Sequence, residues 1–191
     1  MIHLGDNYPH VADIDLFTPA PVHPETEPHV CDYRILIDQR EQAPFRFTGL
    51  RQRESEGGGA VIVETDTTHL VTGDYTLGGL EDRIAIERKS KADLYGTLGR
   101  GRSRFERELV RMQTISSGDG GGFTAVVVEA DWMDLLQVPP AFSRISPASI
   151  EGTILAFMQD FPGVQWVLAS DRRHAEWCTW RLIDRFWRKH S

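Results

Sequence analysis

The chain has 191 residues, enough for one domain with a substantial hydrophobic core. It carries 28 acidic and 21 basic residues, so its net charge of −7 does not indicate general nucleic-acid binding. Its two cysteines are far apart and form no CxxC pattern, which argues against a zinc motif or a disulfide framework and fits a reducing compartment. With no signal peptide and no apolar run long enough to span a bilayer, a cytoplasmic protein with no membrane partner is expected.

The first 32 residues differ in composition from the rest of the chain. They hold six acidic residues, five of the ten prolines, and no Lys or Arg. Few are large and apolar and no periodicity is present, so residues 1–32 are predicted to be a disordered or loosely docked tail that is dispensable up to residue 30. The histidines here are irregularly spaced and are interpreted as solvated: His3, His10, His23 and His29. The folded domain is assigned to residues 33–191.

A buried strand is predicted at the start of this domain, from Tyr33 to the acid Asp38. Residues 44–54 fit either a strand or a short helix. Residues 60–64 are typical of another strand, which residues 65–71 extend or pair again.

The central stretch runs from Gly73 to Lys89 and is predicted to form a β-hairpin, because its flanks are typical of strands and its middle is rich in turn residues. A two-residue tip that pairs Gly79 with Asp82 also pairs Asp74 with Glu87. Directly opposed residues have Cβ atoms about 5 Å apart on one face of the sheet. The two carboxylates are therefore expected to meet at one end of the hairpin.

Glu87 and Lys89 share that face, with roughly 6.6 Å between them along the strand, whereas Arg88 points to the other side. Two carboxylates and a backbone carbonyl form a hard, oxygen-lined site suited to Mg²⁺ or Mn²⁺. Such an ion would polarise a phosphodiester and activate a water, and Lys89 would hold that water or stabilise the developing charge. The alternative is an ordinary surface ion pair between Glu87 and Lys89, because hairpin register is easily misjudged by one residue.

The spacing of these residues resembles a family signature. Gly73-Asp74, twelve residues, Glu87-Arg88-Lys89, three residues and then Asp93 resemble the GD-x(n)-ERK-x3-D signature of XPF-family nucleases. These enzymes belong to the restriction-endonuclease-like PD-(D/E)xK superfamily. Asp38-Gln39-Arg40-Glu41 resembles the D-x-R-E segment that ends the family's first strand, and residues 99–105 resemble its Gly/Arg segment. The resemblance covers residues 34–130 well and the remainder loosely.

The resemblance implies an α/β fold with a mixed central sheet flanked by helices. It also implies a Mg²⁺- or Mn²⁺-dependent endonuclease whose partner is DNA, cut at branches or single-strand/double-strand junctions. Two alternatives stay open: an inactive nucleic-acid-binding scaffold of the same fold, and a restriction-like enzyme that reads a short sequence. XPF-like nucleases usually add a helix-hairpin-helix module that supports dimerisation. No such segment is predicted before Ser191, so either a second copy or a partner protein remains open.

Residue roles follow from this resemblance together with the hairpin geometry. The expected catalytic residues are Asp38, Asp74, Glu87 and Lys89, of which the three acids would hold the metal. The supporting residues are Arg40, Glu41, Arg88 and Asp93; the position of Asp93 in the first turn of a predicted helix favours a capping role over metal ligation. The expected DNA-binding residues are Lys91, Arg100, Arg102, Arg104 and Arg107.

The helix from Arg102 to Ile115 carries much of this basic window, which spans residues 88–111 and holds eight basic residues against three acids. The alternative is a solvated helix face balanced by Glu106 and Glu108. The rest of the chain is predicted to alternate between strands and helices: a strand at 123–129, a helical turn at 131–136, a helix at 149–161, a strand at 164–169 and a helix at 171–189. Four aromatic residues of the last helix are expected in the core or at a dimer surface: Trp177, Trp180, Phe186 and Trp187.

Overall fold

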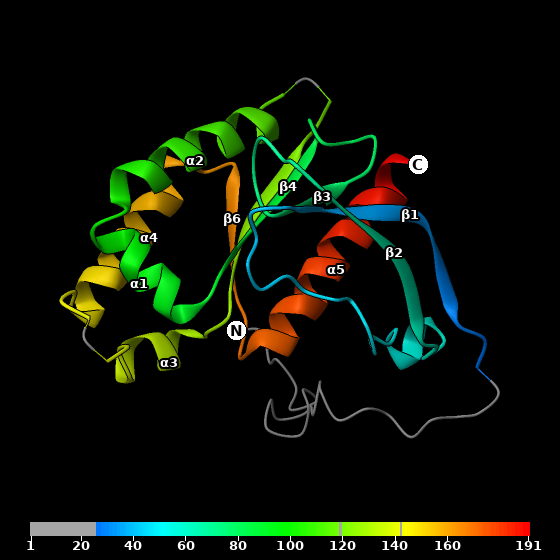
Figure 1. Ribbon diagram of the computed structural model, residues 1–191, viewed down its shortest axis with the longest axis horizontal. Helices are drawn as coiled ribbons and strands as arrows, with labels where there is room; N and C mark the ends of the chain where they lie inside the picture. The colour runs from blue at the N-terminus through cyan, green and yellow to red at the C-terminus, as the bar shows by residue number, and fades with distance from the viewer. Residues whose placement is uncertain (1–25, 119, 142) are drawn as a thin grey trace, which may run out of the picture.

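A computed structural model describes residues 26–118, 120–141 and 143–191, which form a six-stranded sheet with helices on both faces (Figure 1). The predicted α/β fold with a mixed sheet is therefore confirmed. The strands are β1 (His29–Asp38), β2 (Val61–Thr68), β3 (Tyr75–Leu77), β4 (Ile84–Lys89), β5 (Phe123–Val128) and β6 (Val164–Leu168). The helices are α1 (Lys91–Gly99), α2 (Arg102–Ser116), α3 (Trp132–Gln137), α4 (Pro147–Asp160) and α5 (Arg172–His190), and a short 3-10 helix, η2, spans Glu54–Glu56.

The direction of the strands brings several strand ends together. The order across the sheet is β2-β1-β3-β4-β5-β6, in which β3 is antiparallel to both neighbours and the other pairs are parallel. The carboxyl ends of β1 and β4 therefore lie at the same edge as the amino end of β3. Ligand sites of open α/β sheets commonly lie at such an edge.

Each face of the sheet is covered by a different set of helices (Figure 1). Helix α5 packs on one face, where Ala125 and Val127 of β5 join the first core. Helices α1, α2 and α4 cover the other face, where Val126 and Val128 join the second core. Strand β5 is apolar throughout because alternate residues serve both cores, as expected of a central strand.

The segment between β1 and β2 has little regular structure but is firmly attached. The backbone N–H of Phe45 donates to the Tyr75 hydroxyl at 2.9 Å, and the N–H groups of residues 46 and 47 donate to the carboxylate of Glu176. The Arg172 guanidinium of α5 donates to the carbonyls of residues 43 and 44. Phe45, Phe47 and Leu50 are buried in the first core, so this segment completes that layer.

Several predicted boundaries differ from the structure. Strand β1 begins at His29, four residues early, because residues 29 and 30 pair with β2. Helix α4 begins at Pro147, two residues before the predicted start; proline is favourable in a first helical turn because the N–H that it lacks would have no helical partner there. The hairpin tip consists of two successive turns, closed by Leu80 N–H to Leu77 O and Arg83 N–H to Leu80 O, not a two-residue turn. Residues 1–25 of the predicted tail lie outside the described part of the chain.

Helix α5 carries the four aromatic residues as predicted for a core helix. Trp180 and Phe186 are buried, while Trp177 and Trp187 pack against the same core. Among the described residues, no helix combines the length and apolar character needed to cross a membrane.

Candidate functional site

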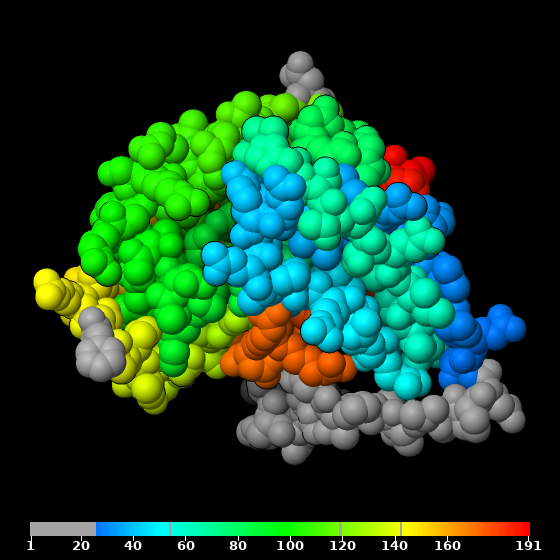
Figure 2. Space-filling view, viewed as in Figure 1, coloured from blue at the N-terminus to red at the C-terminus, as the bar shows by residue number. Residues whose placement is uncertain are grey.

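The predicted catalytic and supporting residues line an open cleft of about 620 Å³ at the carboxyl edge of the sheet, whereas of the predicted DNA-binding residues only Arg104 does. In the space-filling view, the green surface of α1 and α2 and the blue surface after β1 lie on either side of this hollow (Figure 2). All eight of the predicted catalytic and supporting residues contribute to its walls: Asp38, Arg40, Glu41, Asp74, Glu87, Arg88, Lys89 and Asp93.

Gly73 and Asp74 lead into β3 in close contact with β4. Gly73 has a φ of +75°, and a Cβ there would lie 3.0 Å from the carbonyl oxygen of Ile86, so glycine suits this position on both counts. The Asp74 backbone N–H donates to that same oxygen at 2.8 Å, and its carbonyl accepts from Asp38 N–H at 2.9 Å. Pairing of Tyr75 with Ile86 agrees with the predicted register, and the hydrogen bonds between Asp74 and the backbone of Ile86 and Arg88 hold Asp74 beside the end of β4.

Glu87 and Lys89 lie on the face covered by α2, as alternation along the strand predicted. The Lys89 ammonium forms an ion pair with Glu87 Oε1 and lies 5.2 Å from the centre of the Phe105 ring. The two side chains are only 12% and 15% exposed. They do form an ion pair, but not the solvated surface pair that was the alternative.

The two central carboxyl groups are buried, and the pKa values of both are raised. Burial and the neighbouring Glu87 raise the pKa of Asp74 to about 8. Burial also raises the pKa of Glu87, which the Lys89 charge offsets only in part. The same pairing raises the pKa of Lys89 although burial opposes it, so Lys89 stays charged. A further positive charge in this part of the cleft would stabilise the ionised forms of Asp74 and Glu87.

The donor atoms fit a hard cation. Arg88 N–H donates to Asp74 Oδ2 at 2.7 Å, and Lys89 is bound to Glu87 Oε1. Within the described part of the chain, no hydrogen bond ends on the second oxygen of either carboxylate. Each acid therefore offers one oxygen to an ion of the Mg²⁺ or Mn²⁺ class, which prefers oxygen ligands.

Asp38 is close by, but its carboxylate is engaged by a neighbour. It accepts hydrogen bonds from the backbone N–H and the guanidinium of Arg40, which also donates to Leu70 O. Burial alone would raise the pKa of Asp38, but the hydrogen bonds and charge of Arg40 hold it below the usual value. A metal-ligating role for Asp38 stays a prediction, and would require its carboxylate to be shared with Arg40.

Arg88 faces the opposite core and is buried. Its guanidinium donates to Glu129 at 2.7 Å and to Glu41 at 3.1 Å, and it lies over the Phe45 ring. Arg172 of α5 shares the same Glu129 oxygen. Arg88 is therefore largely buried at the base of the cleft and paired with two acids, which is compatible with the predicted supporting role.

The family model described as ERCC4 domain matches residues 37–177, more than half of the chain. The chain belongs to the ERCC4 domain family. The resemblance to XPF-family nucleases is thereby confirmed, and the matched range includes every predicted site residue. A comparison with curated protein sequences found no match.

Two solved structures support the restriction-endonuclease-like fold of this ERCC4 domain. XPF from Aeropyrum pernix matches with a TM-score of 0.51 at 21% identity, covering 81% of this chain and 63% of that one. The same protein in complex with DNA matches with a TM-score of 0.53 at 20% identity, covering 82% and 66%. This chain therefore corresponds to slightly less than two thirds of the XPF chains.

Glu108 of the ERCC4 domain was not predicted as a site residue, yet it lines the cleft. One of its carboxylate oxygens accepts from Gly73 N–H at 3.1 Å, and the other pairs with Arg111. Its side chain is 17% exposed. In the sequence, Glu108 was assigned to charge balance on a helix face; its place one turn after buried Phe105 was the available signal.

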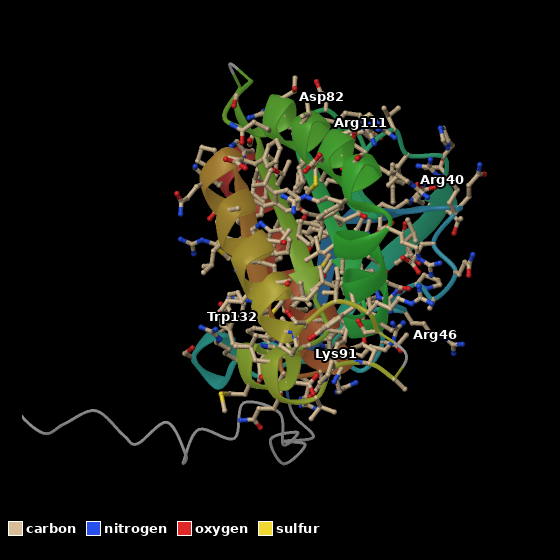
Figure 3. All side chains as sticks on the ribbon, turned by 90° about the vertical axis from the view of Figure 1, so that its left-hand side faces the viewer. Arg40, Arg46, Asp82, Lys91, Arg111 and Trp132 are labelled. Carbon is tan, nitrogen blue, oxygen red and sulfur yellow. The ribbon has the colours of Figure 1, made fainter. Side chains whose placement is uncertain are left out.

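The basic window does not form one continuous surface. Five of its eight cations pair with acids: Arg88 with Glu41 and Glu129, Lys89 with Glu87, Lys91 with Asp134, Arg102 with Glu106, and Arg111 with Glu108. Lys91 and Arg111 lie at opposite ends of the face in Figure 3. Arg104 is exposed, lines the cleft and forms no ion pair within the described residues. Asp93 lies in the first turn of α1 as predicted, but the capping residue is Ser90, whose Oγ accepts from Asp93 N–H and donates to the Asp93 carboxylate.

Proposed function

We propose that this ERCC4 domain is a metal-dependent DNA endonuclease that hydrolyses phosphodiester bonds. The observation that carries the proposal is the convergence of Asp74, Glu87 and Lys89 in an open cleft, with the pKa of both acids raised. Buried carboxylates with raised pKa values at a cleft are typical of functional sites. The XPF structure titled as a complex with DNA supports a nucleic-acid substrate.

In this proposal, Asp74 and Glu87 hold Mg²⁺ or Mn²⁺, with Asp38 as the third candidate ligand. When bound, such an ion polarises a phosphodiester and activates a water molecule. Lys89 Nζ, held by Glu87 and by contact with Phe105, orients the attacking water or stabilises negative charge on the phosphate oxygens. Arg88 N–H keeps the Asp74 carboxylate in a fixed orientation.

The proposed substrate is branched or junction DNA. The cleft is open and has Arg40 on one wall and Arg104 and Arg111 on the other, which suits a backbone passing between them. The alternative substrate is duplex DNA that carries a short recognition sequence, as for a restriction enzyme. A second copy of the chain or a partner protein would extend the DNA contact.

The test is a panel of labelled flap, fork, nicked and plain duplex DNAs incubated with Mg²⁺, with Mn²⁺ or with EDTA. Asp74→Asn and Glu87→Gln each remove a ligand charge and are expected to abolish cleavage while DNA binding persists. Lys89→Ala is expected to slow turnover more than it weakens binding. Asp82→Asn is the matched control, because Asp82 is an exposed acid at the far end of the same hairpin.

Cleavage in EDTA, or full activity of Asp74→Asn, would contradict the metal mechanism. Binding without cleavage of any substrate by the wild-type protein would favour the inactive scaffold. Equal cleavage of plain duplex and branched DNA would contradict the proposed specificity for branched or junction DNA. If Lys89→Ala loses only binding, Lys89 is a phosphate contact and not a catalytic residue.

A further inference from the structure

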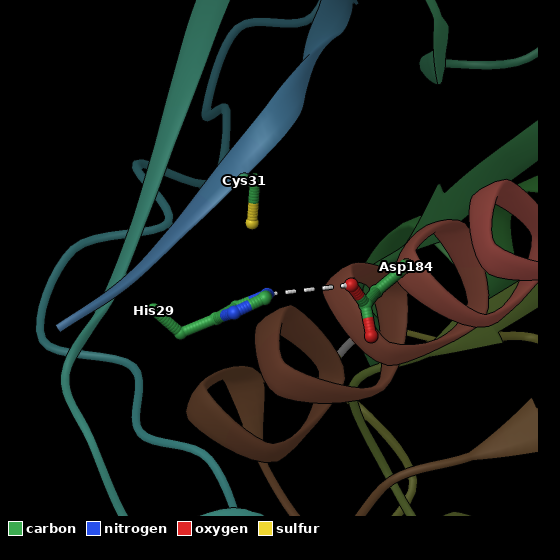
Figure 4. A group of neighbouring side chains, drawn as sticks. All are labelled: His29, Cys31 and Asp184. Atoms are coloured by element: carbon green, nitrogen blue, oxygen red, sulfur yellow. Dashed lines mark ion pairs between the residues drawn. The ribbon is translucent and has the colours of Figure 1, made fainter. Parts of the chain in front are cut away.

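A second group of metal-binding side chains lies at the opposite end of β1 from the cleft. His29 and Cys31 from β1 and Asp184 from α5 place one donor atom each within 4.8 Å of one another (Figure 4). Asp38, at the cleft, is nine residues further along the strand than His29, which corresponds to roughly 30 Å. The group is therefore separate from the proposed nuclease site.

The strand and the helix position these donors for a shared ligand. Residues 29 and 31 are two apart, so both point to the α5 face of the sheet. The two oxygens of Asp184 have separate neighbours: Oδ2 faces Arg188 at 3.0 Å, whereas Oδ1 accepts from the Tyr33 hydroxyl at 3.2 Å. Oδ1 is also the oxygen nearest to His29 Nε2, at 3.8 Å. One carboxylate oxygen thus faces the imidazole and the thiol.

Among the described residues, His29 Nε2 is a buried polar atom without a hydrogen-bond partner. It is buried and makes no hydrogen bond within the described residues, because 3.8 Å to Asp184 is too long for one. A buried polar atom without a partner is destabilising, so such atoms call for an explanation. Ligand bonds of about 2.0–2.3 Å in a tetrahedral zinc site place donor atoms roughly 3.3–3.8 Å apart. The separation between His29 and Asp184 matches that spacing without a direct bond between them.

We propose that His29, Cys31 and Asp184 form a binding site for a transition-metal ion of the Zn²⁺ class. Imidazole nitrogen, thiolate sulfur and carboxylate oxygen are the usual zinc donors, and thiolate disfavours Mg²⁺. Binding forms a bond from the metal to Cys31 Sγ and releases the thiol proton to solvent. The ion connects the first strand to the last helix, and a water molecule completes the tetrahedron beside the partly exposed His29 side chain.

The surrounding residues support this assignment. The Tyr33 hydroxyl donates to Asp184 Oδ1 and keeps that oxygen in place. Arg188 balances the carboxylate charge through the other oxygen.

Cobalt provides a direct probe, because a cobalt–thiolate bond gives a charge-transfer absorption that an oxygen-only site lacks. The full chain, stripped with EDTA and dialysed into excess Mg²⁺ to fill carboxylate sites, is titrated with Co²⁺. We expect a thiolate band that saturates at one equivalent and disappears when Zn²⁺ is added. Cys31→Ser should lose the band and His29→Gln should weaken Co²⁺ binding at least tenfold. Cys178→Ser is the matched control and should keep both the thiolate band and the affinity for Co²⁺, since Cys178 lies outside this group.

Absence of a thiolate band in the wild-type protein, or a band that survives Cys31→Ser, would overturn the proposal. A band lost in Cys178→Ser would place the metal elsewhere. If a variant does not fold, X-ray absorption of the zinc-loaded wild-type chain decides the question: one sulfur ligand per metal supports the site, and oxygen and nitrogen ligands alone refute it.

Discussion

At the scale of single residues, the ionised form of Asp74 is expected to lower the stability of the metal-free fold, although the proposed metal binding needs that form. Its pKa in the folded protein is about 8, against an ordinary value of 3.8. Between these values the folded state keeps a proton that the unfolded state has lost, so stability without metal falls as pH rises from about 4 to 8. Metal binding displaces that proton and is expected to strengthen over the same range.

Asp74→Asn should therefore raise the melting temperature of the metal-free protein, because the amide has no charge to bury and still accepts from Arg88 N–H. The difference from wild type should grow from pH 5 to pH 8; about 1 kcal/mol corresponds to roughly 2–4 °C for a chain of this size. Added Mg²⁺ should stabilise the wild-type protein and not the variant. Thermal melts in EDTA and in Mg²⁺ measure this, with Asp82→Asn as control. A lower melting temperature for Asp74→Asn at pH 8 would contradict the buried-charge account.

Glu108 is expected to position the turn at Gly73. Glu108→Ala removes the acceptor for Gly73 N–H and should lower kcat about tenfold or more with little change in KM, whereas Glu108→Gln keeps an acceptor oxygen and should restore most of the rate. Glu106→Ala, on the outer part of the same helix, is the control. Equal loss in both Glu108 variants, together with weaker Mg²⁺ activation, would instead show that the carboxylate charge acts on the metal.

At the scale of elements, helix α2 presents its arginines to different surroundings. Arg104 lines the cleft, whereas Arg102 pairs with Glu106 and lies over Phe157. We expect Arg104→Ala to lower the slope of log affinity against log salt by about one, as loss of one phosphate contact requires. Arg102→Ala should leave it unchanged. The test measures the DNA affinity of both variants across a salt series. An equal change of slope in both variants would mean that the DNA follows the whole helix.

Strand β1 limits how far the N-terminus can be shortened. Residues 29 and 30 pair with β2, and His29 N–H donates to Ala60 O at 2.8 Å. Removal of residues 1–30 is therefore expected to give a lower melting temperature in EDTA than removal of residues 1–25, because the longer deletion also breaks the end of the ladder. Equal melting temperatures would show that these two pairs contribute nothing measurable.

Features that depend on residues close together in the sequence could be predicted from it, whereas features that depend on packing between distant segments could not. The register of Tyr75 with Ile86 was predictable because a short hairpin is closed by its own turn residues, even though the tip itself was not. The Ser90 cap of α1 was likewise predictable, since the contact spans three residues. The roles of Glu108 and Asp184 were not, because each depends on packing between segments far apart in the chain. The early start of β1 was missed because its pairing partner lies beyond the whole 39–60 segment.

At the scale of the whole molecule, the cleft lies between two packed layers. Its walls come from the segment after β1, which α5 holds through Glu176 and Arg172, and from α1 and α2, which belong to the other layer. The buried Arg88 network joins β4, the end of β5 and α5 into one unit beneath the site. Loss of Arg88 would leave the largely buried Glu41 without its ion-pair partner and Glu129 with Arg172 alone, and removal of one partner of a buried ion pair is destabilising.

The alternation along Glu87, Arg88 and Lys89 also has a consequence for the folding pathway. Neighbouring residues of one strand contact opposite layers, so the proposed catalytic geometry is complete only when both layers have docked. Chains of this length commonly fold through partly structured intermediates, and under the proposed mechanism an intermediate that lacks either layer would not cleave DNA. During refolding from denaturant, nuclease activity should therefore return with the slowest phase, after the tryptophan fluorescence of α5. If the proposed activity returned before that fluorescence, this order would be refuted.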